Sequence, residues 1–200
     1  MLKNNRYLLF LVGKLIFSFG ITLGNRSLFG GNPMAILVVG ISMHLPLTYG
    51  TCNLMVATLE MVIGKSLDSK HVTWVSWVAM VVGSYLIDFT NLLIPISDDL
   101  YIRIIYMLVG VMCYCLGLAI EQTANIGYSN LDVFIFGIKK ALNSKTYHGA
   151  KWIVDAVFIV IGYFLGSKVG IGTVLLLGCA GILIEKFKKL VERMLKINND

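Results

Sequence analysis

Apolar residues dominate this chain in eight runs that short polar stretches separate. The runs cover about residues 7–23, 34–45, 54–63, 72–87, 102–120, 131–142, 152–165 and 174–184. A helix that crosses a bilayer needs about 20 mainly apolar residues. The first, fourth and fifth runs meet this length, and the third, seventh and eighth meet it once their less polar flanks are included. The pattern therefore predicts an all-α membrane bundle with about six transmembrane helices.

The second and sixth runs are too short and too interrupted to cross a membrane. Each follows a polar, glycine-containing stretch, Gly30–Pro33 in one case and Gly127–Asn130 in the other. Irregular chain at membrane depth survives only where protein buries it or where it lines a water-filled cavity. Two such interruptions at matching positions of two halves are typical of a transport site. We expect both segments to be broken or re-entrant.

The two halves of the chain share an internal repeat. A shift of 97 residues places four of the six early glycines on later ones, namely Gly13, Gly20, Gly30 and Gly40 on Gly110, Gly117, Gly127 and Gly137. A shift of 98 aligns Thr48-Tyr49 with Thr146-Tyr147, and Val62-Ile63-Gly64 with Val160-Ile161-Gly162. We therefore interpret residues 1–200 as one membrane domain. Repeat 1 covers about 7–96, repeat 2 covers about 101–190, and residues 191–200 form a cytoplasmic tail.

Charge gives the expected topology. The net charge is +6, and Lys and Arg gather at the ends of the apolar runs, as in the cytoplasmic loops of membrane proteins. If the short segments return to the side they entered from, each half crosses three times and the second half is inverted. Thirteen of the 17 Lys and Arg residues then lie inside, three lie outside, and Lys14 lies within the first helix. Eight crossings would give twelve inside against four outside, so charge favours six only weakly and the length of the short runs is the stronger argument.

The starts of the two short runs are the first candidates for a binding site. Asn32 and Pro33 suit the start of one helix, and Ser129 or Asn130 can cap the other, with Asp132 in its first turn. A helix N-terminus carries partial positive charge and free N–H groups. Two of them facing the middle of the bilayer would hold an anionic or carboxylate group. The equal alternative is a pair of ordinary surface caps.

Acidic residues in apolar segments are costly and therefore count as functional candidates. Glu60 and Asp88 are the best of these, because Glu121 ends its run and Asp155 can pair with Lys151. Asp132 can bind a proton or cation, or simply stabilise its own helix start. The full set of expected binding residues is Asn32, Pro33, Thr48, Asn53, Glu60, Asp88, Ser129, Asn130, Asp132 and Thr146.

Other chemistries find no support in the sequence. It has no metal set, nucleotide motif or nucleophile elbow, so we expect no enzyme, no catalytic residue, no metal and no cofactor. No basic stripe is interleaved with aromatic residues, which argues against nucleic acid as a partner. The four cysteines lie in apolar runs and suit packing.

Four motifs carry a family resemblance that covers nearly the whole chain. They are Gly-Asn-Pro-Met-Ala-Ile-Leu from Gly31, Thr-Tyr-Gly from Thr48, Ser-Asn-Leu-Asp from Ser129 and Gly-Ile-Gly-Thr from Gly170. Together they resemble the YczE/YitT-type bacterial multipass membrane proteins. The chain departs from that pattern where Ala35 replaces an Asp and where Asn130 replaces a Pro. The resemblance implies an integral protein of the bacterial plasma (inner) membrane, and it says more about location than about a substrate.

These arguments favour a multipass membrane protein with both termini in the cytoplasm. The expected role is a small transporter or permease for a small molecule or ion, with its site between the two repeats. The alternative is a non-transporting accessory, or a substrate-binding subunit of a larger transport, export or synthesis complex. The partners are then the lipid bilayer, the ligand, and either a second protein or further copies of the chain.

Overall fold

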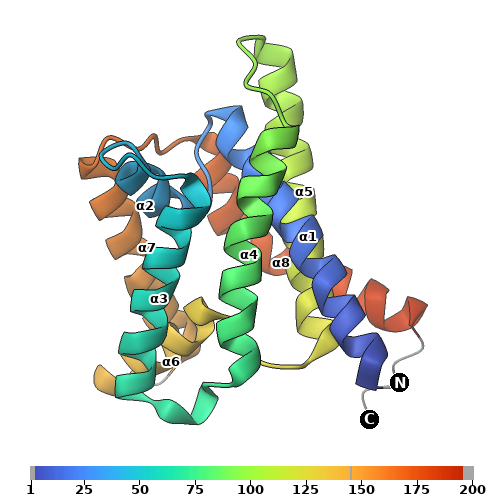
Figure 1. Cartoon of the computed structure of the whole chain (residues 1–200), viewed down its shortest axis with the longest axis vertical. Coiled ribbons are helices and arrows are strands. Elements are labelled where there is room, and N and C mark those ends of the chain that lie inside the picture. Colours follow the sequence, from blue (N-terminus) through green and yellow to red (C-terminus); the bar gives the residue numbers. More distant parts are fainter. Residues whose placement is uncertain (1–2, 145, 196–200) are drawn as a thin grey trace. The chain divides into compact units, whose positions relative to one another are not determined.

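The computed structural model describes residues 3–144 and 146–195, with side chains from residue 6 onward, and shows only helices and loops in this part of the chain (Figure 1). Lys145 and residues 196–200 of the expected tail lie outside the described residues. The elements are α1 (Lys3–Ser27), α2 (Pro33–Ser42), α3 (Tyr49–Leu67), the 3-10 helix η1 (Ser69–His71), α4 (Trp74–Leu93), α5 (Leu100–Ala124), α6 (Asn130–Ala141), α7 (Tyr147–Phe164) and α8 (Ile171–Met194). The expectation of an all-α chain is confirmed.

Three helices are long and apolar enough to cross a membrane, at Arg6–Ser27, Trp74–Leu93 and Leu100–Ala124. They coincide with the three runs that the sequence singled out, and they indicate a membrane protein. The helices α2 and α6 have 10 and 12 residues. At about 1.5 Å per residue, each is roughly half the length of a bilayer core. Neither is long enough to cross by itself.

The helix boundaries follow the repeat in the sequence. Helices α1 and α5 both have 25 residues and begin 97 positions apart, as do the short helices α2 and α6. Helices α3 and α7 begin 98 positions apart, and α4 and α8 begin 97 apart. The chain separates into two compact units, and each unit takes helices from both halves. Unit 1 contains α1, α5, α8 and the end of α4, and unit 2 contains α2, α3, the rest of α4, α6 and α7.

In unit 1, glycines bring the backbones of α1 and α5 into direct contact. A Cβ atom added to Gly20 would lie 2.4 Å from the backbone N of Tyr114, and one added to Gly117 would lie 2.4 Å from the backbone N of Phe17. These two contacts are the same contact seen from each half of the repeat. As α1 advances from Gly13 to Gly20, its neighbours on α5 move back from residue 121 to residue 114, so the two helices are antiparallel.

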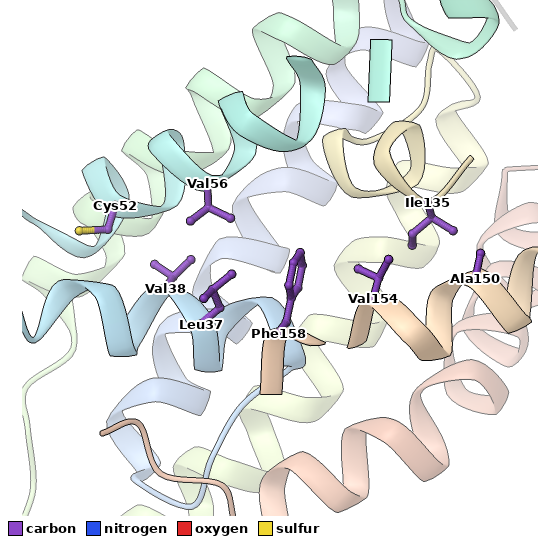
Figure 2. Close-up of a cluster of buried hydrophobic side chains, with 8 residues drawn as sticks. All are labelled: Leu37, Val38, Cys52, Val56, Ile135, Ala150, Val154 and Phe158. Carbon is purple, nitrogen blue, oxygen red and sulfur yellow. The ribbon is translucent and has the colours of Figure 1, made fainter. Parts of the chain in front are cut away.

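In unit 2, each short helix packs against a long helix of the other half. A Cβ atom added to Gly162 of α7 would lie 2.6 Å from the carbonyl oxygen of Ile36 on α2. One added to Gly64 of α3 would lie 2.8 Å from the carbonyl oxygen of Val133 on α6, which is the equivalent contact. Small residues permit this close approach between helices. A cluster of buried apolar side chains in unit 2 consists of Leu37, Val38, Cys52, Val56, Ile135, Ala150, Val154 and Phe158 (Figure 2).

The turns that precede the short helices also repeat each other. Gly30 has a φ of 87°, which glycine adopts without strain, and its added Cβ atom would lie 2.4 Å from Thr173 Oγ1. An added Cβ atom on Gly127 would lie 2.8 Å from Thr73 Oγ1. Each turn is therefore held against a threonine near the start of a long helix.

We expect Gly20→Ala to destabilise the protein, because its new methyl group would overlap the backbone of Tyr114. Overpacking of this kind costs about 1–3 kcal/mol. The matched control is Gly24→Ala on the same helix, where an added Cβ atom meets nothing within 4 Å. Thermal unfolding of the detergent-purified protein measures both, and equal melting temperatures for the two variants would contradict the close packing of α1 on α5.

Candidate functional site

A buried carboxylate connects α3 to the start of α6 in unit 2. Glu60 of α3 is only 3% exposed, and its Oε2 accepts a hydrogen bond of 2.5 Å from Asn130 Nδ2. Asn130 is the first residue of α6, so the bond joins a long helix of the first half to a short helix of the second. Glu60 Oε1 is buried and has no hydrogen-bond partner in the described part of the chain.

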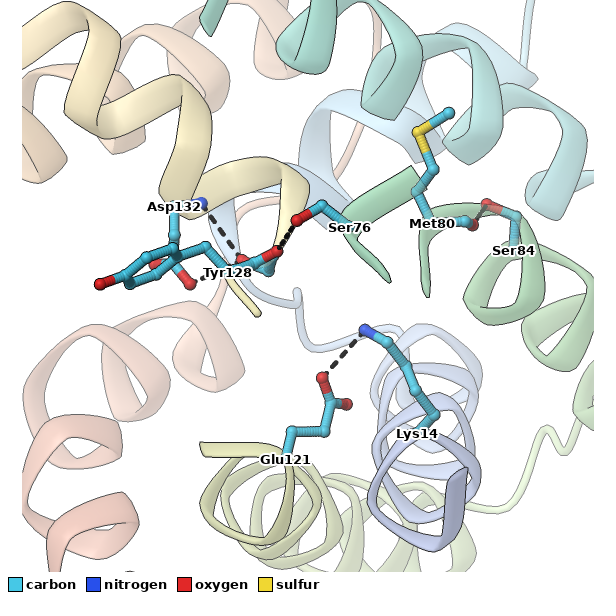
Figure 3. Close-up of polar contacts among 8 residues, drawn as sticks. Lys14, Ser76, Met80, Ser84, Glu121, Tyr128 and Asp132 are labelled. Atoms are coloured by element: carbon cyan, nitrogen blue, oxygen red, sulfur yellow. Dashed lines mark hydrogen bonds and ion pairs between the residues drawn. The ribbon is translucent and has the colours of Figure 1, made fainter. Parts of the chain in front are cut away.

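The first turn of α6 carries a second carboxylate, Asp132, whose partners are all neutral. Ser129 is the N-cap, and its Oγ accepts the backbone N–H of Asp132 at 3.1 Å and donates to Asp132 Oδ2 at 2.8 Å. Tyr147 Oη, from the first residue of α7, donates to Asp132 Oδ1 at 2.5 Å. Figure 3 shows Asp132 beside Tyr128 at this helix start. The starts of α6 and α7 are thus bound to each other through one carboxylate.

No cationic side chain neutralises either acid. Among the described residues, no Lys, Arg or His lies within ion-pairing distance of Glu60 or Asp132. Both acids meet the same turn of chain, because Asn130, which bonds Glu60, and Asp132 both lie in the first turn of α6. An unpaired charge in an apolar interior is costly, so this arrangement requires a proton or a bound cation when the site is closed to water.

The polar site exists in only one half of the repeat. The residues equivalent to Asn130 and Asp132 in α2 are Pro33 and Ala35, and the residue equivalent to Glu60 in α7 is Phe158. Pro33, Ala35 and Phe158 are all buried, and Phe158 belongs to the apolar core of unit 2. The polar site therefore lies at the positions where the two halves of the repeat differ in sequence.

A salt-bridge cluster at the other end of α6 holds this helix against α3. Asp68 follows α3 directly, and its carboxylate lies 3.7 Å from Lys140 Nζ and 3.3 Å from His71 Nδ1. Burial would raise the pKa of Asp68, but the backbone N–H of Lys70 and the nearby positive charges outweigh it and lower the pKa below its ordinary value. The charged form of Asp68 thus helps to fix α6 beside Glu60.

The other expected site residues serve helix starts or helix contacts. Asp88 accepts hydrogen bonds from Thr48 Oγ1 at 2.5 Å and from the backbone N–H of Gly50 at 2.6 Å, so it caps α3. Asn53 Nδ2 donates to Ser84 Oγ at 2.9 Å and joins α3 to α4. All three bonds hold the neighbouring helices α3 and α4 together.

Of the remaining three, Thr146 is the exposed N-cap of α7 and accepts the backbone N–H of Gly149. Pro33 begins α2, which confirms the expected helix start, and Asn32 precedes it. The structure therefore brings together Glu60, Ser129, Asn130 and Asp132, and it leaves the other six expected residues elsewhere.

Sequence reasoning missed Tyr147 as a site residue, although the repeated Thr-Tyr pair had drawn attention to its position. Its hydroxyl group reaches Asp132 because α7 begins beside the start of α6. That arrangement is not visible from spacing alone, since Tyr147 lies 15 residues after its partner.

Comparison with known proteins places the chain in a family. Residues 4–189 match a family model described as a family of unknown function. The chain belongs to the DUF6198 family. It is similar to the uncharacterized protein YyaS of Bacillus subtilis (strain 168), at 25% identity over 193 residues and 94% of each chain. An uncharacterized protein of Haemophilus influenzae (strain ATCC 51907 / DSM 11121 / KW20 / Rd) is 24% identical over 165 residues, covering 82% of this chain and 75% of its own. No solved structure matches the chain.

This DUF6198 chain also contains a buried ion pair in unit 1. Lys14 Nζ of α1 lies 3.0 Å from Glu121 Oε2 of α5, and both side chains are only 7% exposed (Figure 3). The rings of Phe10 and Phe17 lie 5.7 and 5.1 Å from the same ammonium group. A lone lysine inside an apolar helix is visible in the sequence as an unusual residue. Its partner follows only from the antiparallel pairing of α1 with α5.

We expect Lys14→Met to destabilise the protein strongly, because it removes the ammonium group that lies 3.0 Å from the buried carboxylate of Glu121. Breaking a buried ion pair from one side costs about 3–5 kcal/mol. The double variant Lys14→Met/Glu121→Gln removes both charges and should recover most of the loss. Thermal unfolding and the yield of monodisperse protein measure the effect. A double variant as unstable as Lys14→Met alone would show that the ion pair is not the cause.

Proposed function

We propose that the protein is a small transporter or permease of the bacterial plasma membrane, with its substrate site at Glu60, Ser129, Asn130 and Asp132. One observation carries the proposal: a buried carboxylate on a long helix of the first repeat is hydrogen-bonded to the first residue of a short helix of the second. Transporters built from repeats bind their substrates at such junctions, where helices are discontinuous. The kinship to the YczE/YitT-type proteins belongs to the same proposal.

The proposed topology has six crossings in two inverted repeats of one membrane domain. The antiparallel packing of α1 and α5 supports it, since these are equivalent helices of the two halves. If α1 and α5 both cross the membrane, they can be antiparallel only when each half contains an odd number of crossings. Three crossings per half satisfy this condition, whereas four per half would make α5 parallel to α1. With Lys and Arg on the inside, both termini are cytoplasmic.

We expect residue 98 to face the exterior and residue 65 to face the cytoplasm. The test places single cysteines by Asp98→Cys and Lys65→Cys in a chain whose four native cysteines are replaced. Both positions are exposed, so burial does not hide either one. A membrane-impermeant maleimide applied to intact cells should label position 98 at once and position 65 only after permeabilisation. Labelling of position 65 from outside would contradict the inverted repeats.

We expect Asn130→Leu and Asp132→Leu each to abolish transport while the protein still inserts and purifies normally. Both variants remove polar groups from the site and keep a side chain of similar size. The measurement is flux into liposomes by the purified chain, screened over amines, amino acids, carboxylates and inorganic ions. Asp98→Asn, in an exposed loop, is the control and should keep full activity.

Normal flux in both leucine variants would remove these residues from the site. Absence of flux from the unaltered chain, together with a protein that co-purifies in fixed proportion, would instead favour an accessory or substrate-binding subunit. The experiment therefore separates a transporter from a membrane partner of another complex.

A further inference from the structure

The charge of Glu60 is the feature of the site that calls for an explanation. Its carboxylate is 3% exposed, and its one hydrogen-bond donor is the neutral amide of Asn130. Oε1 points into the protein with no partner among the described residues. A carboxylate whose role is only structural would be expected to fill both oxygens with donors, since an unsatisfied buried acceptor destabilises the fold.

The polar groups that the described residues bring toward Glu60 are neutral or negative. From α6 come the amide of Asn130 and the carboxylate of Asp132, and behind Asp132 stands the hydroxyl group of Tyr147 from α7. The packing around Ala57 and Met61, on the turns of α3 that flank Glu60, adds Met80 of α4 and Val133 of α6, which are apolar. Lys140 of α6 is engaged by Asp68 at the far end of that helix.

An anion does not fit this site. The N–H of Asp132 in the first turn of α6 already donates to Ser129, and the charge of Asp132 opposes the positive end of the helix. The other short helix begins at Pro33, which has no N–H to offer. One donor of α6 is thus already used and one is missing in α2, and the two carboxylates of Glu60 and Asp132 repel an anion, so the geometry favours a cation over the carboxylate ligand that the sequence suggested.

We infer that Glu60 is an exchangeable cation site: it holds a proton in the empty protein and releases that proton when a small cation, either Na⁺ or an organic ammonium group, takes its place. The oxygens of Glu60, Asp132 and Ser129 are the kind of hard donors that such cations prefer. The inference rests on the proposed function and names the charge class of its substrate or coupling ion. Phe158 occupies the equivalent position, so the matching junction of α7 with α2 has no such site among the described residues.

Carbodiimide labelling tests this directly, because dicyclohexylcarbodiimide adds to protonated carboxyl groups in apolar surroundings. The protein is purified into lipid, labelled, digested and mapped by mass spectrometry. We expect one labelled position per chain, at Glu60, with a rate that falls severalfold as pH rises from about 6 to about 9. Na⁺ or tetramethylammonium should slow labelling severalfold relative to N-methylglucamine at equal ionic strength. Protection by Na⁺ identifies a metal cation, and protection by tetramethylammonium identifies an organic one.

Two variants control for folding. Glu60→Gln keeps the shape of the side chain and an acceptor for Asn130, and it should lose the label and the protection without a large change in melting temperature. Glu185→Gln removes an exposed acid that pairs with Lys189, and it should leave the labelling of Glu60 and its protection by cations unchanged. If Glu60→Gln fails to fold, Glu60→Asp keeps a carboxyl group at the same position and should retain the label.

Absence of labelling at Glu60, or a rate that ignores both pH and cations, would overturn the inference, and so would protection by acetate instead of a cation. The readout needs no flux, so it is independent of the transport assay. A protein that transports but shows no cation protection would retain the proposed function and lose this assignment. Protection without flux would keep the cation site and contradict the transporter.

Discussion

Contact between helix backbones at glycine is the constraint on which the rest of this structure depends. In a lipid environment the hydrophobic effect gives little reason for two helices to associate, so close packing has to supply it. Gly20 and Gly117 permit α1 and α5 to touch, and Gly64 and Gly162 do the same for the pairs in unit 2. Each contact occurs twice because the repeat occurs twice, and each joins one half of the chain to the other.

The exchange of short helices between halves explains where the polar site lies. Helix α6 packs on α3, so its first residue meets a side chain that is 70 positions earlier in the chain. The equivalent junction between α2 and α7 has Pro33 and Phe158 instead, and it is closed by apolar packing. The fold thus has internal symmetry, but the polar site lies at only one of these two equivalent junctions in the described part of the chain.

The sequence predicts the helices of this protein better than it predicts their partners. Apolar runs and capping residues locate the starts of α2 and α6 because these are local properties of the chain. The sequence does not tell which acid binds a ligand and which supports a helix, since the local sequence around an acid in an apolar run does not depend on its partner. Asp88 turned out to cap α3 through Gly50, whereas Glu60 joined α6. Only the pairing of helices separates these two cases.

The buried acids Glu121 and Glu60 show what that pairing decides. The carboxylate of Glu121 lies beside the ammonium group of Lys14, so the pair has no net charge. This pair holds α1 to α5. Glu60 has an amide on one oxygen and no partner on the other among the described residues, so the part of the fold that the structure describes does not balance its charge. A charge that the fold has already balanced can only stabilise the fold. A carboxylate that has no cationic partner at a helix junction attracts any cation that enters the site. This difference in pairing is the physical basis for assigning a binding role to Glu60 and a structural role to Glu121.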